Sequence, residues 1–394
     1  MTWKCRVAVG VPVVGLVTAV GILILGEPSS VKPSGKVVTP TLATVIPTVG
    51  TLSVSANQLL ANGRPVVLHG VNRSGTEYAC VQFGGPFDGP SDQASVAAIV
   101  AWHVNAVRVP LNEDCWLGIN GQPVGGLTAQ QYQHGIEDYV SLLHANGLYV
   151  ILELHWSAPG NHVASYQTNL PDYDHSLALW ASVASAFKGD GATVFDLFNE
   201  PNDDGQHCGS TSPKTCFTDP HQNWWCWSHG QGCVTNHNPS WGTWRIAGME
   251  ELIGAVRSTG ASNVVMAGGL QHANDMSRWL AYRPSDPASQ LAASFHLYNF
   301  NGCNSVSCWD AQVAPVAAVV PLVTGEIGET DGRHSFIDRY TAWADPKRIG
   351  YLGWTWNAWG CDKGAVLIAD YTGTPCQTFG SGFQAHLAGL SATG

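Results

Sequence analysis

Two glutamates, Glu200 and Glu326, each stand at the end of an apolar run, and their side chains could do chemistry together. Glu200 ends the run 194–198 and is followed by Pro201, while Glu326 ends the run 319–323. Proline at this point stops further strand pairing, and runs that are apolar on both faces are typical of buried parallel strands. Cleavage of a bond between two sugars needs a proton for the departing oxygen and a carboxylate for the developing positive charge, so two facing carboxyl groups meet both needs.

Strand-like and helix-like segments alternate along the chain and would hold these glutamates in place. Strands are predicted for residues 66–71, 105–111, 148–155, 193–200, 263–267, 293–298, 319–326 and 349–356. Helical patterns are found at residues 92–103, 128–146, 175–188, 244–259, 274–280, 307–318, 336–344 and 383–390. Repeated strand-then-helix order implies a parallel sheet, and about eight such units predict an α/β fold of the (β/α)8 TIM-barrel type, whose chemistry lies at the carboxyl ends of its strands.

The start of the predicted barrel carries a hairpin signal. Residues 52–60 and 65–71 flank Asn62-Gly63, the favoured two-residue turn. The structural alternative is an open doubly wound sheet, which would place a Gly-x-Gly-x-x-Gly turn after the first strand. The sequence there is His69-Gly70-Val71-Asn72 instead. We therefore expect a barrel with an N-terminal hairpin.

Composition limits the classes of partner. Only 12% of the 394 residues are charged, well under the value of about 25% that is usual for soluble domains. The net charge of -11 and the pI of about 5.7 argue against a nucleic-acid partner, which needs clustered Lys and Arg. The 16 tryptophans fit a neutral polyhydroxylated ligand whose rings stack on aromatic faces, although tryptophan also fills cores.

The N-terminal segment predicts export. Lys4 and Arg6 precede residues 7–25, which are apolar and uncharged. Their length and the lack of a clean Ala-x-Ala site leave two interpretations of residues 1–26, a signal peptide or a membrane anchor. Residues 27–51, rich in Pro, Ser, Thr and Val, are predicted to be a linker to one catalytic domain at 52–394. Either interpretation gives a secreted or extracytoplasmic domain, in the second case anchored to the membrane.

Cysteine usage agrees with export, because ten cysteines remain when Cys5 of the N-terminal segment is set aside. Close spacing favours the disulfides Cys226–Cys233, Cys303–Cys308 and Cys361–Cys376, and leaves Cys208–Cys216 and Cys80–Cys115. The alternative is a zinc site built from the cysteines of loop 202–243 with His207, His221, His229 and His237. No tight Cys-x-x-Cys pair occurs there, so we expect long disulfide-stapled loops on the catalytic face. This Trp-rich loop would be a wall of a substrate cleft, a stapled flap, or both.

Short motifs occur at the ends of the predicted strands. In chain order they are His69-Gly70-Val71-Asn72, Val107-Arg108-Val109-Pro110, Leu152-Glu153-Leu154-His155-Trp156, Asn199-Glu200-Pro201, Phe295-His296-Leu297-Tyr298, Gly325-Glu326-Ile327-Gly328 and Gly353-Trp354-Thr355-Trp356-Asn357. From about residue 52 to the C-terminus, this ordered set resembles glycoside hydrolase family 5, the cellulase family of the clan A retaining glycosidases.

The resemblance implies a double-displacement mechanism. Glu326 would attack the anomeric carbon, while Glu200 would protonate the departing oxygen and later deprotonate a water. Negative Glu326 would raise the pKa of Glu200 until Glu326 is esterified. Supporting or substrate-binding roles would fall on Arg108 and Tyr298 beside Glu326, Asn199 at the sugar 2-hydroxyl, and His155, His296, Trp354 and Trp356.

Several of these residues also have an ordinary structural interpretation. Arg108 could be a buried ion-pair partner of Glu153 or Asp196, and His155 and His296 could be core histidines.

Other residues near the strand ends also have two interpretations. Glu329 is a rival nucleophile just beyond the strand end, and Glu77 and Tyr78 could line a donor subsite or serve only the loop. One of Trp354 and Trp356 would stack on sugar while the other packs, with Trp354 the better candidate for stacking.

The motifs do not separate the substrates of the family. We expect an endo-β-1,4-glucanase that acts on a β-linked polysaccharide or oligosaccharide, with a β-mannanase or an exo-acting β-glucosidase as alternatives. An inactive carbohydrate-binding protein is the alternative from another class, but both glutamates and their neighbours are present. No metal or organic cofactor is implied, because both catalytic groups are side chains, and a monomer is expected.

Overall fold

Eight parallel strands close into a barrel in the computed structural model, which describes residues 49–202, 220–235 and 238–393. In chain order the barrel strands are β4 (His69–Asn72), β5 (Ala106–Asn112), β6 (Tyr149–Trp156), β7 (Thr193–Asp196), β10 (Val265–Gly268), β11 (Leu291–Tyr298), β12 (Leu322–Gly328) and β13 (Gly350–Gly353). Each strand pairs with the next, and β13 pairs with β4, which confirms the predicted barrel. All carboxyl ends therefore open on one face.

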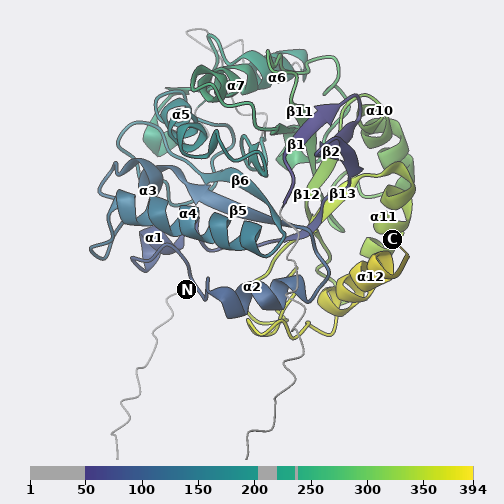
Figure 1. Ribbon diagram of the computed structural model, residues 1–394. Helices are drawn as coiled ribbons and strands as arrows, with labels where there is room; N and C mark the ends of the chain where they lie inside the picture. Colours follow the sequence, from purple (N-terminus) through teal and green to yellow (C-terminus); the bar gives the residue numbers. More distant parts are fainter. Residues whose placement is uncertain (1–48, 203–219, 236–237, 394) are drawn as a thin grey trace, which may run out of the picture. The chain divides into compact units, whose positions relative to one another are not determined.

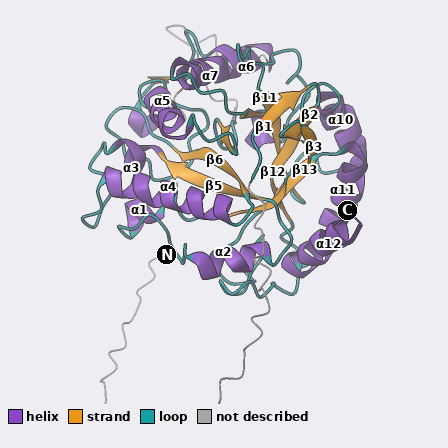
Figure 2. Cartoon of the chain, viewed as in Figure 1, coloured by secondary structure: helices purple, strands orange, loops and turns teal. Residues whose placement is uncertain are grey.

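Helices surround the strands (Figure 1, Figure 2). The larger crossovers contain α2 (Gln93–Val100), α4 (Ala129–Ala145), α5 (Ser176–Phe187), α7 (Met249–Ser258), α10 (Ala314–Ala317) and α11 (Ser335–Ala344), and α12 (Phe379–Thr393) follows the last strand. Further helices lie in the loops, at α1 (Ala79–Gln82), α3 (Glu113–Leu117), α6 (Pro220–His229), α8 (Leu270–Ala273) and α9 (Val306–Cys308). The start of α4 follows from sequence, because Thr128 and Gln131 cap each other's backbone N–H groups.

One predicted helix is wrong. Residues 274–280 form turns after the short α8, and the Trp279 indole N–H donates to the Ala267 carbonyl at 3.0 Å. Trp279 is fully buried, so this contact fixes the segment in a compact, non-helical path. Tertiary packing has overridden a local helical preference.

The helix predicted at 244–259 begins late. Its first residues instead form β9 (Trp244–Arg245), which pairs antiparallel with β8 (Val234–Thr235), and the helix starts at Met249. The acidic first turn of α7, Glu250 and Glu251, favours this start because carboxylates stabilise helix amino ends.

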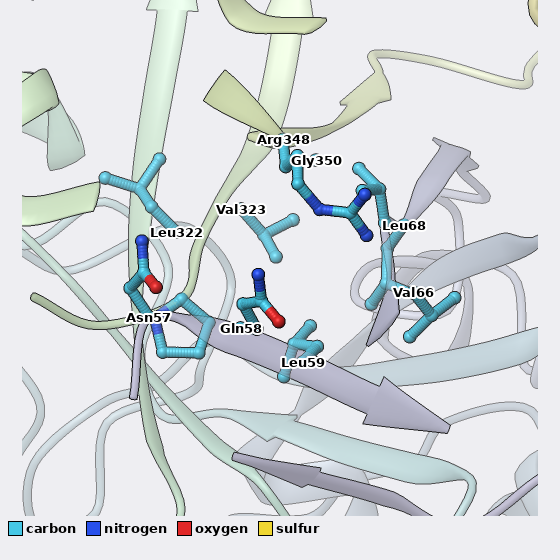
Figure 3. Close-up of a pocket in the computed structure, with 11 residues that line it drawn as sticks. Asn57, Gln58, Leu59, Val66, Leu68, Leu322, Val323, Arg348 and Gly350 are labelled. Carbon is cyan, nitrogen blue, oxygen red and sulfur yellow. The ribbon is translucent and has the colours of Figure 1, made fainter. Parts of the chain in front are cut away.

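A three-stranded antiparallel sheet, β1 (Leu52–Ser55), β2 (Gln58–Ala61) and β3 (Arg64–Val66), covers the amino ends of barrel strands. Asn62 and Gly63 join β2 to β3 with φ of 49° and 78°, as a tight hairpin turn with two left-handed residues requires. Figure 3 shows side chains of β2 lying beside Leu322 and Val323 at the start of β12. The cavity between them is about 20 Å³, close to the space of one water molecule, so it cannot hold a sugar.

Disulfides staple the loops as predicted. Cys80–Cys115, Cys226–Cys233, Cys303–Cys308 and Cys361–Cys376 are all formed. Cys226 and Cys233 are therefore not thiolates that could bind zinc. The predicted pair Cys208–Cys216, the apolar segment 7–25 and the linker up to residue 48 lie outside the described residues. Within the described ranges, no helix combines the length and the apolar character needed to cross a bilayer.

Candidate active site

The two predicted glutamates meet at the carboxyl end of the barrel. Glu326 lies within β12, and Glu200 lies just beyond β7 with a left-handed φ of 48°. The chain before Glu200 stays attached to β6, because the Asn199 N–H donates to the Leu154 carbonyl at 2.8 Å. A carboxylate oxygen of Glu200, a ring nitrogen of His296 and a carboxylate oxygen of Glu326 all lie within 4.8 Å of one another.

Two donors fix the carboxylate of Glu326. Arg108 Nη1 donates to Oε1 at 2.8 Å, and the Tyr298 hydroxyl donates to Oε2 at 2.6 Å. Burial and the charge of Glu326 raise the pKa of Tyr298 well above its ordinary value, so this hydroxyl remains a donor. Glu326 is only 3% exposed, and it is held in one orientation at the bottom of the cleft.

Arg108 ties Glu326 to the floor of the site. Its Nε lies 3.1 Å from Asp196 Oδ2, and its Nη1 lies 3.5 Å from Glu153 Oε1. Burial alone would lower the pKa of Arg108, but the charges of Glu153, Asp196 and Glu326 raise it, so the guanidinium stays charged. Both interpretations of Arg108 therefore hold, since it pairs with the structural carboxylates and with Glu326.

Glu200 is surrounded by imidazoles and an amide. His296 Nδ1 lies 3.2 Å from Oε1, while His272 Nδ1 and Gln167 Nε2 lie 3.5 Å and 3.3 Å from Oε2. Burial would raise the pKa of Glu200, but hydrogen bonds from His272 and His296 outweigh burial and hold the pKa below its ordinary value. The expected rise is wrong for the free protein, because the hydrogen bonds and charges of two imidazoles outweigh the effect of burial.

His155 and Asn199 extend the polar floor. Burial would lower the pKa of His155, but Glu153, whose Oε1 lies 2.5 Å from His155 Nδ1, raises it to about 9. The imidazole is therefore cationic at neutral pH. Asn199 accepts from Arg108 Nη2 at 2.9 Å and donates to Gln167 Oε1 at 2.8 Å, which sets the orientation of its amide.

The two candidate tryptophans are placed differently. Trp354 lines the cleft and stacks on the imidazole of His155, with ring centroids 5.5 Å apart and an interplanar angle of 16°. Trp356 is fully buried and packs edge-on against Trp102. Trp354 therefore faces the cleft and Trp356 packs in the core, as the expected division of the pair requires, and a substrate-binding role for Trp356 is wrong. Strand β13 ends at Gly353, so the alternation of side chains on a strand does not extend to Trp356.

The rival carboxylates have structural partners. Glu329 Oε2 accepts the backbone N–H groups of Phe336 and Ile337 at 2.9 and 3.1 Å, so Glu329 holds the amino end of α11. Glu77 accepts the Gly75 N–H at 2.6 Å, and burial raises the pKa of Glu77 to about 7.

An aromatic wall stands on the β4 side of the site. The ring of Tyr78 lies 6.1 Å from that of Trp156 and 6.3 Å from that of Trp359, and the Trp359 indole N–H donates to the Tyr78 hydroxyl at 3.0 Å. Such faces suit sugar rings.

The cleft in front of the glutamates has a volume of about 450 Å³. Six of its lining residues were not foreseen from sequence: Gln167, His272, Phe300, Asn301, Thr330 and Ala365. Gln167 lies in a loop and His272 in the short, irregular α8, and neither segment has a recognisable sequence pattern. Phe300 follows Tyr298 by two residues and could have been noted as an aromatic residue just past a strand end.

Glu200, His296 and Glu326 are also the donor types that a cation would use. Arg108 and Tyr298, however, already donate to the two oxygens of Glu326. The cationic Arg108 beside Glu326 repels a further cation, so the arrangement better suits a neutral substrate.

Comparison with known proteins agrees with this fold. The model of the family Cellulase (glycosyl hydrolase family 5) matches residues 59–360. A mannan endo-1,4-beta-mannosidase from Streptomyces lividans is 26% identical over 317 residues, which are 78% of this chain and 66% of that relative. This chain thus spans just under two thirds of the relative's length.

Solved structures share the fold at low sequence identity. A beta-glucanase from Saccharophagus degradans is 18% identical with a TM-score of 0.64, covering 89% of this chain and 95% of that chain. An endocellulase from Pyrococcus horikoshii is 18% identical with a TM-score of 0.61, covering 86% and 98%. Because the family model spans most of the sequence and the barrel places the motif residues at one mouth, the chain belongs to glycoside hydrolase family 5, the cellulase family.

Proposed function

We propose that the protein is a retaining glycoside hydrolase that cleaves β-linked glucan as an endo-β-1,4-glucanase. The observation that carries this proposal is the short separation of Glu200 and Glu326, with carboxylate oxygens within 4.8 Å. Retaining enzymes hold their two carboxyl groups about 5–5.5 Å apart, whereas inverting enzymes leave about 6.5–9.5 Å for a water. The spacing therefore supports direct attack by one carboxylate on the sugar.

Glu326 is the nucleophile in this proposal. One of its oxygens bonds to the anomeric carbon as the bond from that carbon to the leaving oxygen breaks, and Glu200 gives the leaving oxygen a proton. Water then attacks the anomeric carbon, loses a proton to Glu200 and releases the carboxylate of Glu326. Support comes from Arg108 and Tyr298, which orient Glu326 for attack.

Glu200 must carry a proton in the first step and lose it in the second. Its lowered pKa favours the ionised form that the second step needs. His272 would supply the proton for the first step, because its hydrogen bond to Glu200 raises the pKa of His272. In the free protein the proton would lie on His272, and it would pass through Glu200 to the leaving oxygen in the first step.

The choice of glucan rests on relatives. The beta-glucanase from Saccharophagus degradans that shares this fold has been solved with cellotetraose, which favours glucan. The mannosidase relative favours mannan, so β-mannanase is the second candidate. Glucose and mannose differ in the orientation of the 2-hydroxyl, the group that Asn199 would contact. An exo-acting β-glucosidase is less favoured, because the cleft continues into a second hollow.

We also propose that the protein acts outside the cytoplasm, as a secreted monomer or anchored through its N-terminal segment. The four disulfides of the described residues support an oxidising compartment. A monomer is supported because one chain supplies both carboxylates and their neighbours.

The test is reducing-sugar release by the full-length chain on β-1,4-glucan, mixed-linkage glucan, mannan and xylan, with Glu326→Ala as the blank. Activity on the glucans that vanishes in the blank is expected. Activity on mannan alone would agree with the proposed mechanism but would show that the substrate is mannan and not glucan. If the chain hydrolysed none of the polymers and no aryl glycoside, the proposal would be overturned in favour of a binding protein.

A further inference from the structure

We propose that Gln167 is a positioning residue, which fixes the amide of Asn199 for the sugar 2-hydroxyl and links that amide to Glu200. The inference rests on the proposed function. Gln167 lies in the loop between β6 and α5, at residues 157–175, and its side chain lines the cleft in front of the two glutamates. Its amide lies between the two groups, because Oε1 accepts from Asn199 Nδ2 at 2.8 Å and Nε2 lies 3.3 Å from Glu200 Oε2.

The hydrogen bonds through Gln167 run in one direction only. Arg108 has no acceptor, so the oxygen of the Asn199 amide must face its Nη2, at 2.9 Å. Asn199 Nδ2 therefore faces Gln167, which turns Gln167 Oε1 toward Asn199 and Gln167 Nε2 toward Glu200. There Nε2 meets two acceptors, a carboxylate oxygen and the backbone carbonyl of Glu200, each at 3.3 Å. Turning either amide over would bring like groups together, so both amides have one orientation. Because Arg108 also donates to Glu326, this chain of hydrogen bonds connects the two glutamates.

Among the described residues, one N–H of Asn199 is left for the substrate. The amide nitrogen carries two hydrogens, and Gln167 accepts one of them. Asn199 Nδ2 also lies 3.4 Å from His155 Nε2, but the cationic ring of His155 carries a hydrogen on that nitrogen and cannot accept. The second N–H is therefore available to an acceptor in the cleft, which Asn199 and His155 both line. The sugar 2-hydroxyl is the acceptor that the proposed role of Asn199 requires.

The loop holds Gln167 on both sides. Before it, the Ala164 N–H donates to Asp114 Oδ2 at 2.9 Å, which attaches the loop to α3. After it, Thr168 is 1% exposed, and its hydroxyl lies 2.7 Å from that of Ser157 at the start of the loop. A side chain on an anchored backbone orients its neighbour at a smaller cost in conformational entropy than a mobile one would.

A fixed Asn199 amide matters most in the transition state. Hydrogen bonds to the 2-hydroxyl of a glycoside strengthen as the transition state forms. They do so fully only if the donor already points at the hydroxyl, since a donor that must first turn loses part of the gain. The alternative is a purely structural role, in which Gln167 only supports the backbone carbonyl of Glu200. Loss of such a role would affect substrates with and without the 2-hydroxyl equally.

The test compares wild type and Gln167→Met on two substrates. One is a dinitrophenyl β-glycoside of a disaccharide from the polymer that the wild type cleaves, and the other is its analogue without the 2-hydroxyl on the sugar next to the dinitrophenyl group. Methionine keeps the length of the side chain and removes the amide. The ratio of kcat/KM on the first substrate to kcat/KM on the second should fall by about tenfold, the effect of about one hydrogen bond. Both values are measured on one sample, so any loss of folded enzyme cancels in the ratio.

Two further variants complete the test. Gln167→Glu keeps an oxygen that accepts from Asn199, so it should restore the ratio to within about twofold of wild type. Its negative charge beside Glu200 should also move the acid limb of the kcat–pH profile to higher pH, because a like charge raises the pKa of a carboxyl group. Gln133→Met is the matched control, because Gln133 on α4 is also half-buried and donates to the Trp116 carbonyl at 2.6 Å. The control should leave the ratio and the profile unchanged.

An unchanged ratio in Gln167→Met would overturn the role of Gln167 while the hydrolase activity stands, and so would a Gln167→Glu variant with the same ratio as Gln167→Met. A wild-type chain that cleaves neither the polymers nor the aryl glycosides would overturn the proposed function and this inference with it.

Discussion

The carboxylates of Glu200 and Glu326 come from strand positions separated by β10 and β11, yet their oxygens lie within 4.8 Å. They share His296, whose Nδ1 lies 3.2 Å from Glu200 Oε1 and 3.6 Å from Glu326 Oε2, but their other partners differ. Arg108 and Tyr298 hold Glu326, whereas His272, His296 and Gln167 surround Glu200. Because the two environments differ, substitutions in each should have separable effects.

Amide substitutions should separate the two proposed roles. Glu326→Gln should abolish turnover of polysaccharide and of a β-glycosyl fluoride, because no covalent intermediate can form. Glu200→Gln should slow polysaccharide hydrolysis by about 100- to 10,000-fold, the usual contribution of a general acid. Fluoride departs without a proton, so Glu200→Gln should still show a stoichiometric burst of fluoride ion, followed with a fluoride electrode. A burst from Glu326→Gln and none from Glu200→Gln would reverse the assignment.

Tyr298→Phe should reduce kcat by roughly 10- to 150-fold, since a hydrogen bond to a charged group contributes about 1.5–3 kcal/mol. The Tyr298 hydroxyl lies 2.6 Å from Glu326 Oε2. Steady-state kinetics on the best polymer provide the measurement. Tyr351→Phe is the matched control, because that hydroxyl donates to Asp345 away from the site. The control should lower the melting temperature and keep kcat; a normal kcat for Tyr298→Phe would contradict the role.

His272→Ala should move the acid limb of the kcat–pH profile to higher pH when hydrolysis of the intermediate limits turnover. In that step Glu200 acts as a base and must be ionised. The hydrogen bond from His272 helps to hold the pKa of Glu200 below its ordinary value, so ionisation survives at low pH in wild type. Without His272 the pKa of Glu200 rises, and activity is lost at a higher pH.

The profile is best measured with an aryl glycoside that has a good leaving group. His334→Ala removes a histidine whose side chain is 48% exposed and lies 2.7 Å from Asp338, and it should leave both limbs in place. A His272→Ala profile that overlays wild type would contradict the coupling.

A buried carboxyl pair should make stability fall as pH rises. The Ser176 hydroxyl lies between the two carboxyl groups, 2.6 Å from Glu113 Oε2 and 3.1 Å from Asp172 Oδ2. Burial raises the pKa of Glu113 well above its ordinary value and that of Asp172 to about 7. In the unfolded chain both titrate near pH 4, at about 4.3 and 3.9. The folded protein therefore binds more protons than the unfolded chain between these values, and the free energy of unfolding decreases through this window.

Glu113→Gln imitates the protonated acid and should reduce this decrease by about 1–3 kcal/mol between pH 5 and pH 8, measured by chemical denaturation. The exposed Asp138→Asn on α4 is the control and should keep the wild-type slope. An unchanged slope in Glu113→Gln would show that the pair does not share its proton.

Trp354 and Trp356 should respond in opposite ways to truncation. Trp356→Ala should destabilise the fold by about 3–5 kcal/mol, as for other fully buried aromatic residues, because the ring packs on Trp102. Trp354→Ala should instead raise KM with a small change in melting temperature, since the ring lines the cleft. Thermal melts and initial rates on both variants give the answer. A large loss of stability in Trp354→Ala alone would contradict the assignment.

Much of the fold could be predicted, because barrel strands combine continuous apolar runs with polar strand ends. The motif positions Arg108, Asn199, Tyr298 and Glu326 are brought together because strand ends converge at one face. The hairpin turn and the disulfides could also be predicted, because an Asn-Gly turn and a disulfide between closely spaced cysteines both depend on residues that are near one another in the sequence.

The parts that sequence did not reveal depend on irregular backbone. His272 lies in α8, where Gln271 and His272 have φ of 55° and 59°, values that no periodic pattern predicts for non-glycine residues. Its approach to Glu200 also reversed the expected pKa shift. The strand predicted at 349–356 ends at Gly353, so strand geometry does not decide where Trp356 points. Residues 274–280 form turns instead of a helix because Trp279 packs in the core.

The sheet of β1, β2 and β3 closes the amino end of the barrel, where the cavity beside Leu322 and Val323 is about 20 Å³. In the proposed double displacement, substrate, water and products would therefore all pass through the opposite end of the barrel, where the cleft lies. The hydrolytic water must enter through the mouth by which the leaving chain departs, so the two events compete for one path. A sugar that reaches the mouth before water would be joined to the retained chain, and the enzyme would lengthen as well as shorten its substrates at high sugar concentration.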